Sequence, residues 1–167
     1  LGVPVINSFE HLCEQLSVTE QLLYFLTYKK KYCYFEKKIP KKDKTERTLN
    51  VPSLSLKVVQ RWILKEILEK IYVSKQAMAF IPHKNGLREN AERHKKNIFL
   101  LEMDITNFFG TITEQQVYRL FCNIGYNSKV AGILANLCTY DGYLPQGAVT
   151  SPYIANLICY HMDARIN

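Results

Sequence analysis

The sequence predicts an α+β fold, in which several helices accompany a small amount of strand. Residues 54–72 carry apolar side chains at three- and four-residue spacing, which is typical of an amphipathic helix. Residues 31–52 contain two extended stretches around a polar turn, which predicts a β-hairpin. The apolar run at residues 97–105 is typical of a buried strand. With 167 residues, 47% of them hydrophobic, the chain can form one globular domain or two small lobes that share a core.

The N-terminal residues are expected to form two short helices. Ser8 and Ser17 each precede an apolar stretch and are predicted N-caps, and Glu20 stands at the capping-box spacing from Ser17. The hairpin follows, with "KKDKTE" as its polar turn. In the long helix after it, we expect Trp62 to pack in the core.

The second half of the chain is predicted to be mostly helical apart from the strand. Residues 86–94 are expected to form a short helix. Thr113 begins another helix, with a glutamine at the capping-box spacing, and Ser128 caps a third. "YDGYLPQGAVTSP" is expected to be a loop, and Thr150 or Ser151 before a proline begins the last helix.

The composition favours a polyanionic partner. The chain has 22 Lys and Arg against 15 Asp and Glu, which gives a formal net charge of +7. Such a balance favours nucleic acid or an anionic surface as the partner, and the alternative is a basic charge that serves solubility alone.

Other features of the sequence bear on its compartment. The five cysteines are widely spaced and form no Cys-x-x-Cys pair, so we expect free thiols in a reducing cytoplasm. No signal peptide and no apolar run of about 18 residues is present, which predicts no membrane span. The chain begins with Leu1 rather than Met, and we interpret it as a fragment of a longer protein.

The first candidate site is the basic hairpin. From Lys29 to Arg47 the chain has nine basic and three acidic residues, interleaved with Tyr32, Tyr34 and Phe35. Lys and Arg on a protruding hairpin suit the binding of triphosphate or backbone phosphate. The alternative is a solvated face, to which charge runs usually belong.

Two further candidates lie in the second half. Asp104 ends the apolar run, where a carboxylate is costly unless it is paired or binds a metal, and Mg²⁺ is held by one or two such carboxylates. The alternative is an aspartate that caps a turn. In "LPQG", Gln146 offers an amide and Gly147 allows a ligand to approach the backbone closely, although a surface loop explains both equally well.

Four blocks, in this order, resemble the reverse transcriptases, most closely the bacterial retron type, from about residue 20 to the end. "IPKKDKTERTLNVPSLSLKVVQRWILKEILEKI" is similar to the fingers hairpin and its long helix. "AFIPHKNGLRENAERH" resembles the next block, with Asn90, Ala91 and His94 at the retron-like spacing. "LLEMDITNFFGTI" resembles the palm motif that carries the first metal-binding aspartate, and "LPQGAVTSPYIANLICYHMDARI" the motif that lines the nucleotide pocket.

The resemblance implies the fingers and an incomplete palm of a right-hand polymerase. Residues 1–30 would be N-terminal helices, residues 31–96 the fingers, and residues 97–167 a partial palm with the nucleotide-pocket loop. The implied activity is RNA-directed DNA polymerisation in the cytoplasm, on an RNA template with a DNA or RNA primer. The alternatives are a group II intron or phage-defence reverse transcriptase, or a non-catalytic nucleic-acid-binding module with this fold.

The resemblance also implies the chemistry of the site. Lys41 and Arg47 would hold the triphosphate of the incoming dNTP. Asp104 would bind both catalytic Mg²⁺ ions, with help from the backbone carbonyl of Ile105. One ion would activate the primer 3′-oxygen and the other would steady the leaving pyrophosphate.

The remaining implied roles concern the sugar and the base of the nucleotide. Phe109 would lie under the sugar and exclude a 2′-hydroxyl, which selects deoxynucleotides. Gln146 and Gly147 would contact the nucleotide and the template base that pairs with it.

The chain departs from the family pattern at three places. Asn107 stands where retron-like chains usually have a second acid, and Asp43-Lys44 stand where the fingers turn usually has a glycine. The third departure is the missing Asp-Asp motif, because the four aspartates of the chain are not adjacent. We therefore expect a fragment that cannot polymerise alone and that self-associates through an unpaired edge of the strand at 97–105.

Overall fold

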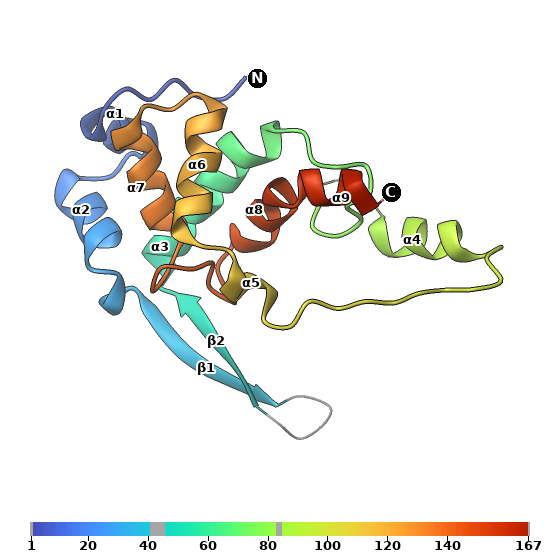
Figure 1. Ribbon diagram of the computed structural model, residues 1–167. Coiled ribbons are helices and arrows are strands. Elements are labelled where there is room, and N and C mark those ends of the chain that lie inside the picture. Colours follow the sequence, from blue (N-terminus) through green and yellow to red (C-terminus); the bar gives the residue numbers. More distant parts are fainter. Residues whose placement is uncertain (1, 41–45, 83–84, 167) are drawn as a thin grey trace.

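A computed structural model describes residues 2–40, 46–82 and 85–166, and it confirms the α+β class (Figure 1). In these ranges the α-helices are α1 (Phe9–Leu16), α2 (Glu20–Tyr28), α3 (Leu54–Trp62), α4 (Gly86–His94), α5 (Phe108–Thr111), α6 (Glu114–Ile124), α7 (Ser128–Cys138), α8 (Ser151–Ile158) and α9 (Tyr160–Ile166). The strands are β1 (Tyr34–Pro40) and β2 (Glu46–Pro52), and the other helical turns are η1 (Lys30–Tyr32), η2 (Ile63–Ile67) and η3 (Leu68–Lys70). Among the described residues, no helix has the length and apolar character needed to cross a bilayer.

The two N-terminal helices form as predicted, but one cap differs. The Ser8 hydroxyl accepts a hydrogen bond from the His11 N–H at 3.1 Å, which confirms it as the N-cap of α1. The prediction for Ser17 was wrong, because Ser17 adopts a left-handed conformation (φ 53°) and ends α1. Thr19 caps α2 instead and accepts from the Leu22 N–H at 3.3 Å.

The long helix is helical over residues 54–70, but it is not uniform. After α3, the five-residue turn η2 is π-helical and η3 is a 3₁₀ turn. The predicted apolar stripe is buried, with Val59 at 2% exposure and both Ile63 and Ile67 at 0%. Trp62 is half-buried and packs against the core.

The helices of the second half close the core. The Thr113 hydroxyl accepts from the Gln116 N–H, and the Gln116 side chain accepts from the Thr113 N–H at 2.8 Å, which confirms the capping box of α6. Helix α7 is capped by Asn127, one residue before the predicted Ser128. Helices α6 and α7 pack together, and α1, α2 and α3 pack on α7.

The two strands of the basic hairpin are confirmed and project from the helical body (Figure 1), and residues 41–45 of its predicted turn lie outside the described residues. β1 and β2 are antiparallel, with Tyr34 opposite Pro52 and Glu36 opposite Asn50. Because directly opposed residues point to the same side of a sheet, Glu36, Thr48 and Asn50 share one face.

The predicted buried strand at residues 97–105 was wrong. The segment lies apart from the helical body with α4 at its far end (Figure 1), and it pairs with neither described strand. Its apolar side chains face solvent, with Phe99 at 89% and Leu101 at 80% exposure. A strand needs a neighbour to satisfy its backbone hydrogen bonds, and the described part of the chain supplies none here.

A polar cluster ties the N-terminal segment to α6 and α7. The Lys30 ammonium lies 3.1 Å from a Glu114 carboxylate oxygen, and the Thr139 hydroxyl donates to the same oxygen at 2.8 Å. Burial raises the pKa of Glu114, but the hydrogen bonds from Thr139 and Lys30 and the Lys30 charge outweigh it, so its pKa is lowered.

We expect Glu114→Gln to reduce the pH dependence of stability. A lowered carboxyl pKa stabilises the fold above the unfolded-state pKa of about 4.3, and this stabilisation is lost as the pH falls through the lower folded pKa. The substitution should cost about 0.5–1 kcal/mol at pH 7, discounted because the carboxylate is partly exposed, and little at pH 3. Urea unfolding between pH 3 and pH 7 measures this difference.

Glu92→Gln is the matched control, since Glu92 pairs with Arg88 on an exposed helix face at 2.9 Å. It should change the unfolding free energy by less than about 0.5 kcal/mol at either pH. An equal loss in the Glu114 variant at pH 3 and pH 7 would contradict the assignment.

Candidate functional site

A cleft of about 710 Å³ lies between the hairpin and the loops that precede α8. Its walls come from both strands, from the start of α5 and from residues 140–146. The hairpin contributes Glu36, Thr48 and Asn50, which share the face identified from the register. Arg47 also lines the cleft, and it forms no ion pair with a described carboxylate.

The loop wall of the cleft begins with a tight turn. Tyr140 and Tyr143 exchange both backbone hydrogen bonds, at 2.9 and 3.1 Å. Asp141 (φ 52°) and Gly142 (φ 81°) between them are both left-handed, as a two-residue hairpin of type I′ requires. The Asp-Gly dipeptide is the sequence signal for this turn, which was predicted only as part of a longer loop.

The turn is anchored to the start of α6. The Glu114 N–H donates to the Gly142 carbonyl at 2.8 Å, and the Leu144 N–H donates to the Ile112 carbonyl at 3.0 Å. These backbone bonds fix the direction in which the chain enters "LPQG", so the loop wall is held by the helical body.

Gln146 and Gly147 join this loop to the hairpin. The Asn50 N–H donates to the Gln146 carbonyl at 2.8 Å, and a Cβ on Gly147 would lie 2.8 Å from the Asn50 carbonyl oxygen. Gly147 also has φ 123°, which side chains disfavour. The close approach that the sequence predicted at Gly147 is therefore made by the backbone of β2, and its contact with a nucleotide stays a prediction.

A buried amide behind the cleft connects three segments. Gln60 is 0% exposed, and its amide nitrogen donates to the Tyr34 hydroxyl at 3.0 Å and to the Leu137 carbonyl at 2.9 Å. Its amide oxygen accepts from the Val149 N–H at 3.3 Å. Burial raises the pKa of Tyr34, and the hydrogen bond with Gln60 offsets part of that effect.

The role of Gln60 was not predicted, although the sequence carries a signal for it. Gln60 stands one position after Val59 and three before Ile63, on the apolar stripe of the long helix. A polar residue on such a stripe must find buried partners, because an unpaired buried amide is costly.

The predicted metal ligands are not among the residues that line the cleft. Asp104 is exposed and Ile105 is 48% exposed, on the segment that leads into α5. Thr106 and Asn107, which follow, do line the cleft. Among the described residues, no three His, Cys, Asp or Glu side chains converge as metal ligands would. Asp104 and the Ile105 carbonyl by themselves therefore do not form a site for two Mg²⁺ ions.

The other predicted residues are also accounted for. Phe109 is half-buried, with its ring 5.8 Å from that of Phe108, and both pack against the core rather than line the cleft. Asn107 adopts a left-handed conformation (φ 51°), and its side chain occupies the space that a Cβ on Gly110 would need. Lys41 lies outside the described residues.

Comparison with known proteins gives consistent matches. The sequence profile of the family "Reverse transcriptase (RNA-dependent DNA polymerase)" matches residues 39–167. The Ec86 retron reverse transcriptase of Escherichia coli is 36% identical over 99% of this chain and 52% of its own length. The Mx162 retron reverse transcriptase of Myxococcus xanthus is 28% identical over 99% of this chain and 39% of its own, and the Se72 retron enzyme of Salmonella heidelberg is 30% identical over 97% and 43%. The chain thus spans about half the length, or less, of these relatives.

We expect Gly147→Ala to destabilise the contact between the loop and β2. The added methyl group overlaps the Asn50 carbonyl, and alanine is strained at φ 123°. The unfolding free energy should fall by about 3 kcal/mol or more, since strain and overlap act together. Urea unfolding measures the loss, and hydrogen exchange of the Asn50 amide should accelerate.

Gly125→Ala is the matched control, because Gly125 has a similar φ of 117° but nothing within 4 Å of an added Cβ. Its unfolding free energy should fall only by the cost of backbone strain, about 1–2 kcal/mol, and hydrogen exchange of the Asn50 amide should stay unchanged. Equal losses in the two variants would mean that the contact with Asn50 contributes nothing.

Proposed function

Because the chain belongs to the reverse transcriptase family, we propose that the protein containing it is an RNA-directed DNA polymerase. It would join deoxynucleotides to a DNA or RNA primer on an RNA template. The observation that carries the proposal is the cleft, which Arg47 of the hairpin and Gln146 of the loop both line, and whose wall includes Thr106, two residues after Asp104. Retron reverse transcriptases cover nearly the whole chain, which favours the retron type.

We propose the following roles in nucleotidyl transfer. The primer 3′-oxygen attacks the α-phosphorus of the dNTP, and the bond to pyrophosphate breaks. Arg47, which forms no described ion pair, would hold the triphosphate together with Lys41, and Gln146 would contact the base pair being formed. Phe109, the second residue of α5, packs against the core in this structure, and its role in limiting space at the sugar 2′ position rests on the family resemblance.

Asp104 would be one ligand of a two-magnesium site, assisted by the Ile105 carbonyl. Its exposure on the segment beside the cleft is compatible with this role. The remaining carboxylates of such a site are not among the described residues, so residues 1–167 alone are expected to give no primer extension.

The architecture that we propose is that of a right-hand polymerase. Residues 1–30 would be N-terminal helices, residues 31–96 the fingers and residues 97–167 part of the palm. The apolar segment at 97–105 would then pair as a palm strand in the whole protein. The exposure of its apolar residues Phe99 and Leu101 supports the proposal that a further strand covers them there.

Other members of the same family remain alternatives. A group II intron or phage-defence reverse transcriptase would share this cleft, whereas a non-catalytic nucleic-acid-binding module would keep the basic hairpin without the chemistry. The five cysteines are all free, which supports a reducing compartment such as the cytoplasm.

We expect Asp104→Asn to abolish most activity of the protein that contains this chain. Loss of one metal-binding carboxylate should lower the rate on the order of a thousandfold in primer extension on an RNA template with dNTPs and Mg²⁺. In the same assay, Arg47→Ala should mainly raise the KM for the dNTP, because its role is to bind phosphate.

Glu102→Gln is the control, since Glu102 is an exposed acid two residues away on the same segment. It should leave the rate within about twofold, because it is assigned no part in the chemistry. Near-normal primer extension by Asp104→Asn would refute the metal-ligand role. If the unsubstituted protein that contains this chain showed no primer extension, the non-catalytic nucleic-acid-binding module would be favoured.

We also propose that residues 1–167 in isolation self-associate through the segment at 97–105. Unpaired backbone groups and exposed apolar side chains favour pairing with a second copy. Sedimentation velocity should show oligomers that increase with concentration, and Leu101→Lys should reduce them. Leu87→Lys is the control, because Leu87 is similarly exposed, at 86%, and this change should not reduce the oligomers. A monomer at high protein concentration would exclude the proposal.

A further inference from the structure

The outer side of α2 carries an unusual group of exposed aromatic residues. Leu23, Leu26 and Thr27 bury the opposite side of this helix. The exposed group, which we call the aromatic face, consists of Tyr24 (54%), Phe25 (41%), Tyr28 (53%) and Tyr32 (67%). Single exposed aromatics are ordinary, but four on nine consecutive residues suggest a binding surface.

The rings of the aromatic face are arranged in contact with one another. The Tyr24 and Tyr28 ring centroids are 4.9 Å apart, and those of Phe25 and Tyr32 are 6.4 Å apart in a stacked arrangement with an interplanar angle of 26°. The four rings therefore form two pairs in contact, one on the outer side of α2 and one between α2 and η1, before any ligand binds.

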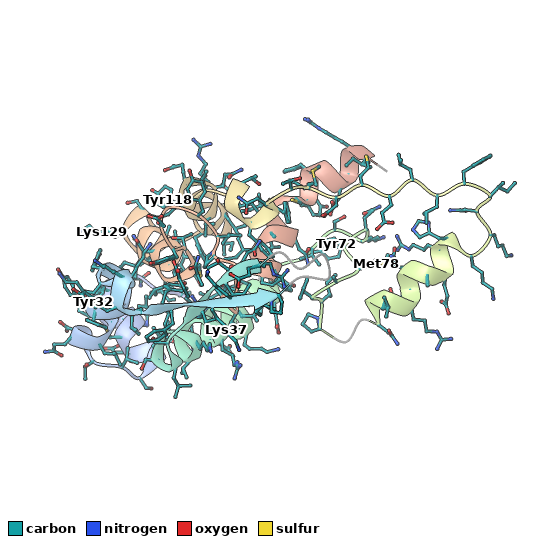
Figure 2. The ribbon with its side chains drawn as sticks, turned by 90° about the horizontal axis from the view of Figure 1, so that it is seen from below. Tyr32, Lys37, Tyr72, Met78, Tyr118 and Lys129 are labelled. Carbon is teal, nitrogen blue, oxygen red and sulfur yellow. The ribbon has the colours of Figure 1, made fainter. Side chains whose placement is uncertain are left out.

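Cations border the aromatic face. Lys29 and Lys31 are adjacent to its residues in sequence, and neither pairs with a described carboxylate. Lys30 between them is instead engaged by Glu114 and Thr139. Lys37 extends the positive charge along β1, and Figure 2 shows Tyr32 at the base of that strand and Lys37 farther along it.

We propose that the aromatic face binds a single-stranded segment of RNA outside the cleft. Bases stack on aromatic side chains whatever their sequence, while flanking lysines contact the phosphates. RNA fits better than a protein partner, because Lys29 and Lys31 pair with no described carboxylate and can contact phosphates beside the stacked bases.

The aromatic face is separated from the cleft by the buried base of the hairpin. Cys33 and Tyr34, which follow Tyr32, are 1% and 7% exposed. The Tyr34 ring packs 4.5 Å from that of Tyr140, and its hydroxyl bonds to Gln60. The RNA bound to the aromatic face would therefore contact residues other than those proposed to bind the dNTP. The inference does not depend on catalysis.

Fluorescence anisotropy with a labelled 20-nucleotide oligouridylate, without dNTPs or Mg²⁺, tests this inference. All proteins carry Arg47→Ala, so that the cleft contributes equally to each. The pair Tyr24→Ala and Tyr28→Ala should raise the Kd about tenfold or more, because each stacked base is lost. Tyr72→Ala is the matched control, since Tyr72 is 61% exposed and lies far from Tyr32 (Figure 2), and it should change the Kd by less than about twofold.

A second measurement uses the salt dependence of binding. The pair Lys29→Ala and Lys31→Ala should reduce the slope of log K against log salt by about 1.4, which corresponds to two phosphate contacts on a single strand. Circular dichroism verifies that each variant is folded. An unchanged Kd in the tyrosine variant, or an unchanged salt slope in the lysine variant, would overturn the inference. If both variants kept their RNA affinity, the aromatic face would instead be assigned to binding a protein.

Discussion

The buried amide of Gln60 is the interaction on which the arrangement of the cleft depends. It satisfies the hydroxyl of Tyr34 at the base of the hairpin, the carbonyl of Leu137 at the end of α7 and the N–H of Val149 beyond the loop. Burying any one of these groups without a hydrogen-bond partner would lower the stability of the fold by about 1–3 kcal/mol. The amide at this position of α3 therefore satisfies polar groups from three segments at once.

Backbone contacts then set the shape of the cleft in front of Gln60. The Asp141-Gly142 turn fixes the direction of the loop, and the hydrogen bond from Asn50 to Gln146 attaches the loop to β2. Because Gly147 has no side chain, the two backbones can approach this closely. Any ligand between hairpin and loop would meet walls that are linked to each other, which is the preorganisation that nucleotide binding requires.

The segment at residues 97–105 has the sequence pattern of a buried strand but does not form one in the described structure. Its apolar, β-prone residues indicate a buried strand, and this expectation was wrong for the described structure, where the segment is exposed. Strand formation depends on a partner that is distant in sequence, whereas helix formation depends on neighbours within four residues. For the same reason the starts of α4, α6 and α7 were predicted within one or two residues. The last predicted helix is instead divided into α8 and α9, α5 was not predicted, and Thr19 and Asn127 rather than Ser17 and Ser128 cap α2 and α7.

The sequence by itself determined the α+β class, the strands of the basic hairpin, most of the helices and the candidate residues Arg47, Asp104 and Gln146. These follow from local periodicity, from turn residues and from motif order, which a linear chain displays directly. Only the tertiary structure decided that Gln60 connects three segments, that Gly147 lies close to the backbone of β2, and that Phe25 of α2 stacks with Tyr32 of η1. The physical reason is that burial, hydrogen-bond satisfaction and close backbone approach are relations between distant residues, which exist only once the chain has folded.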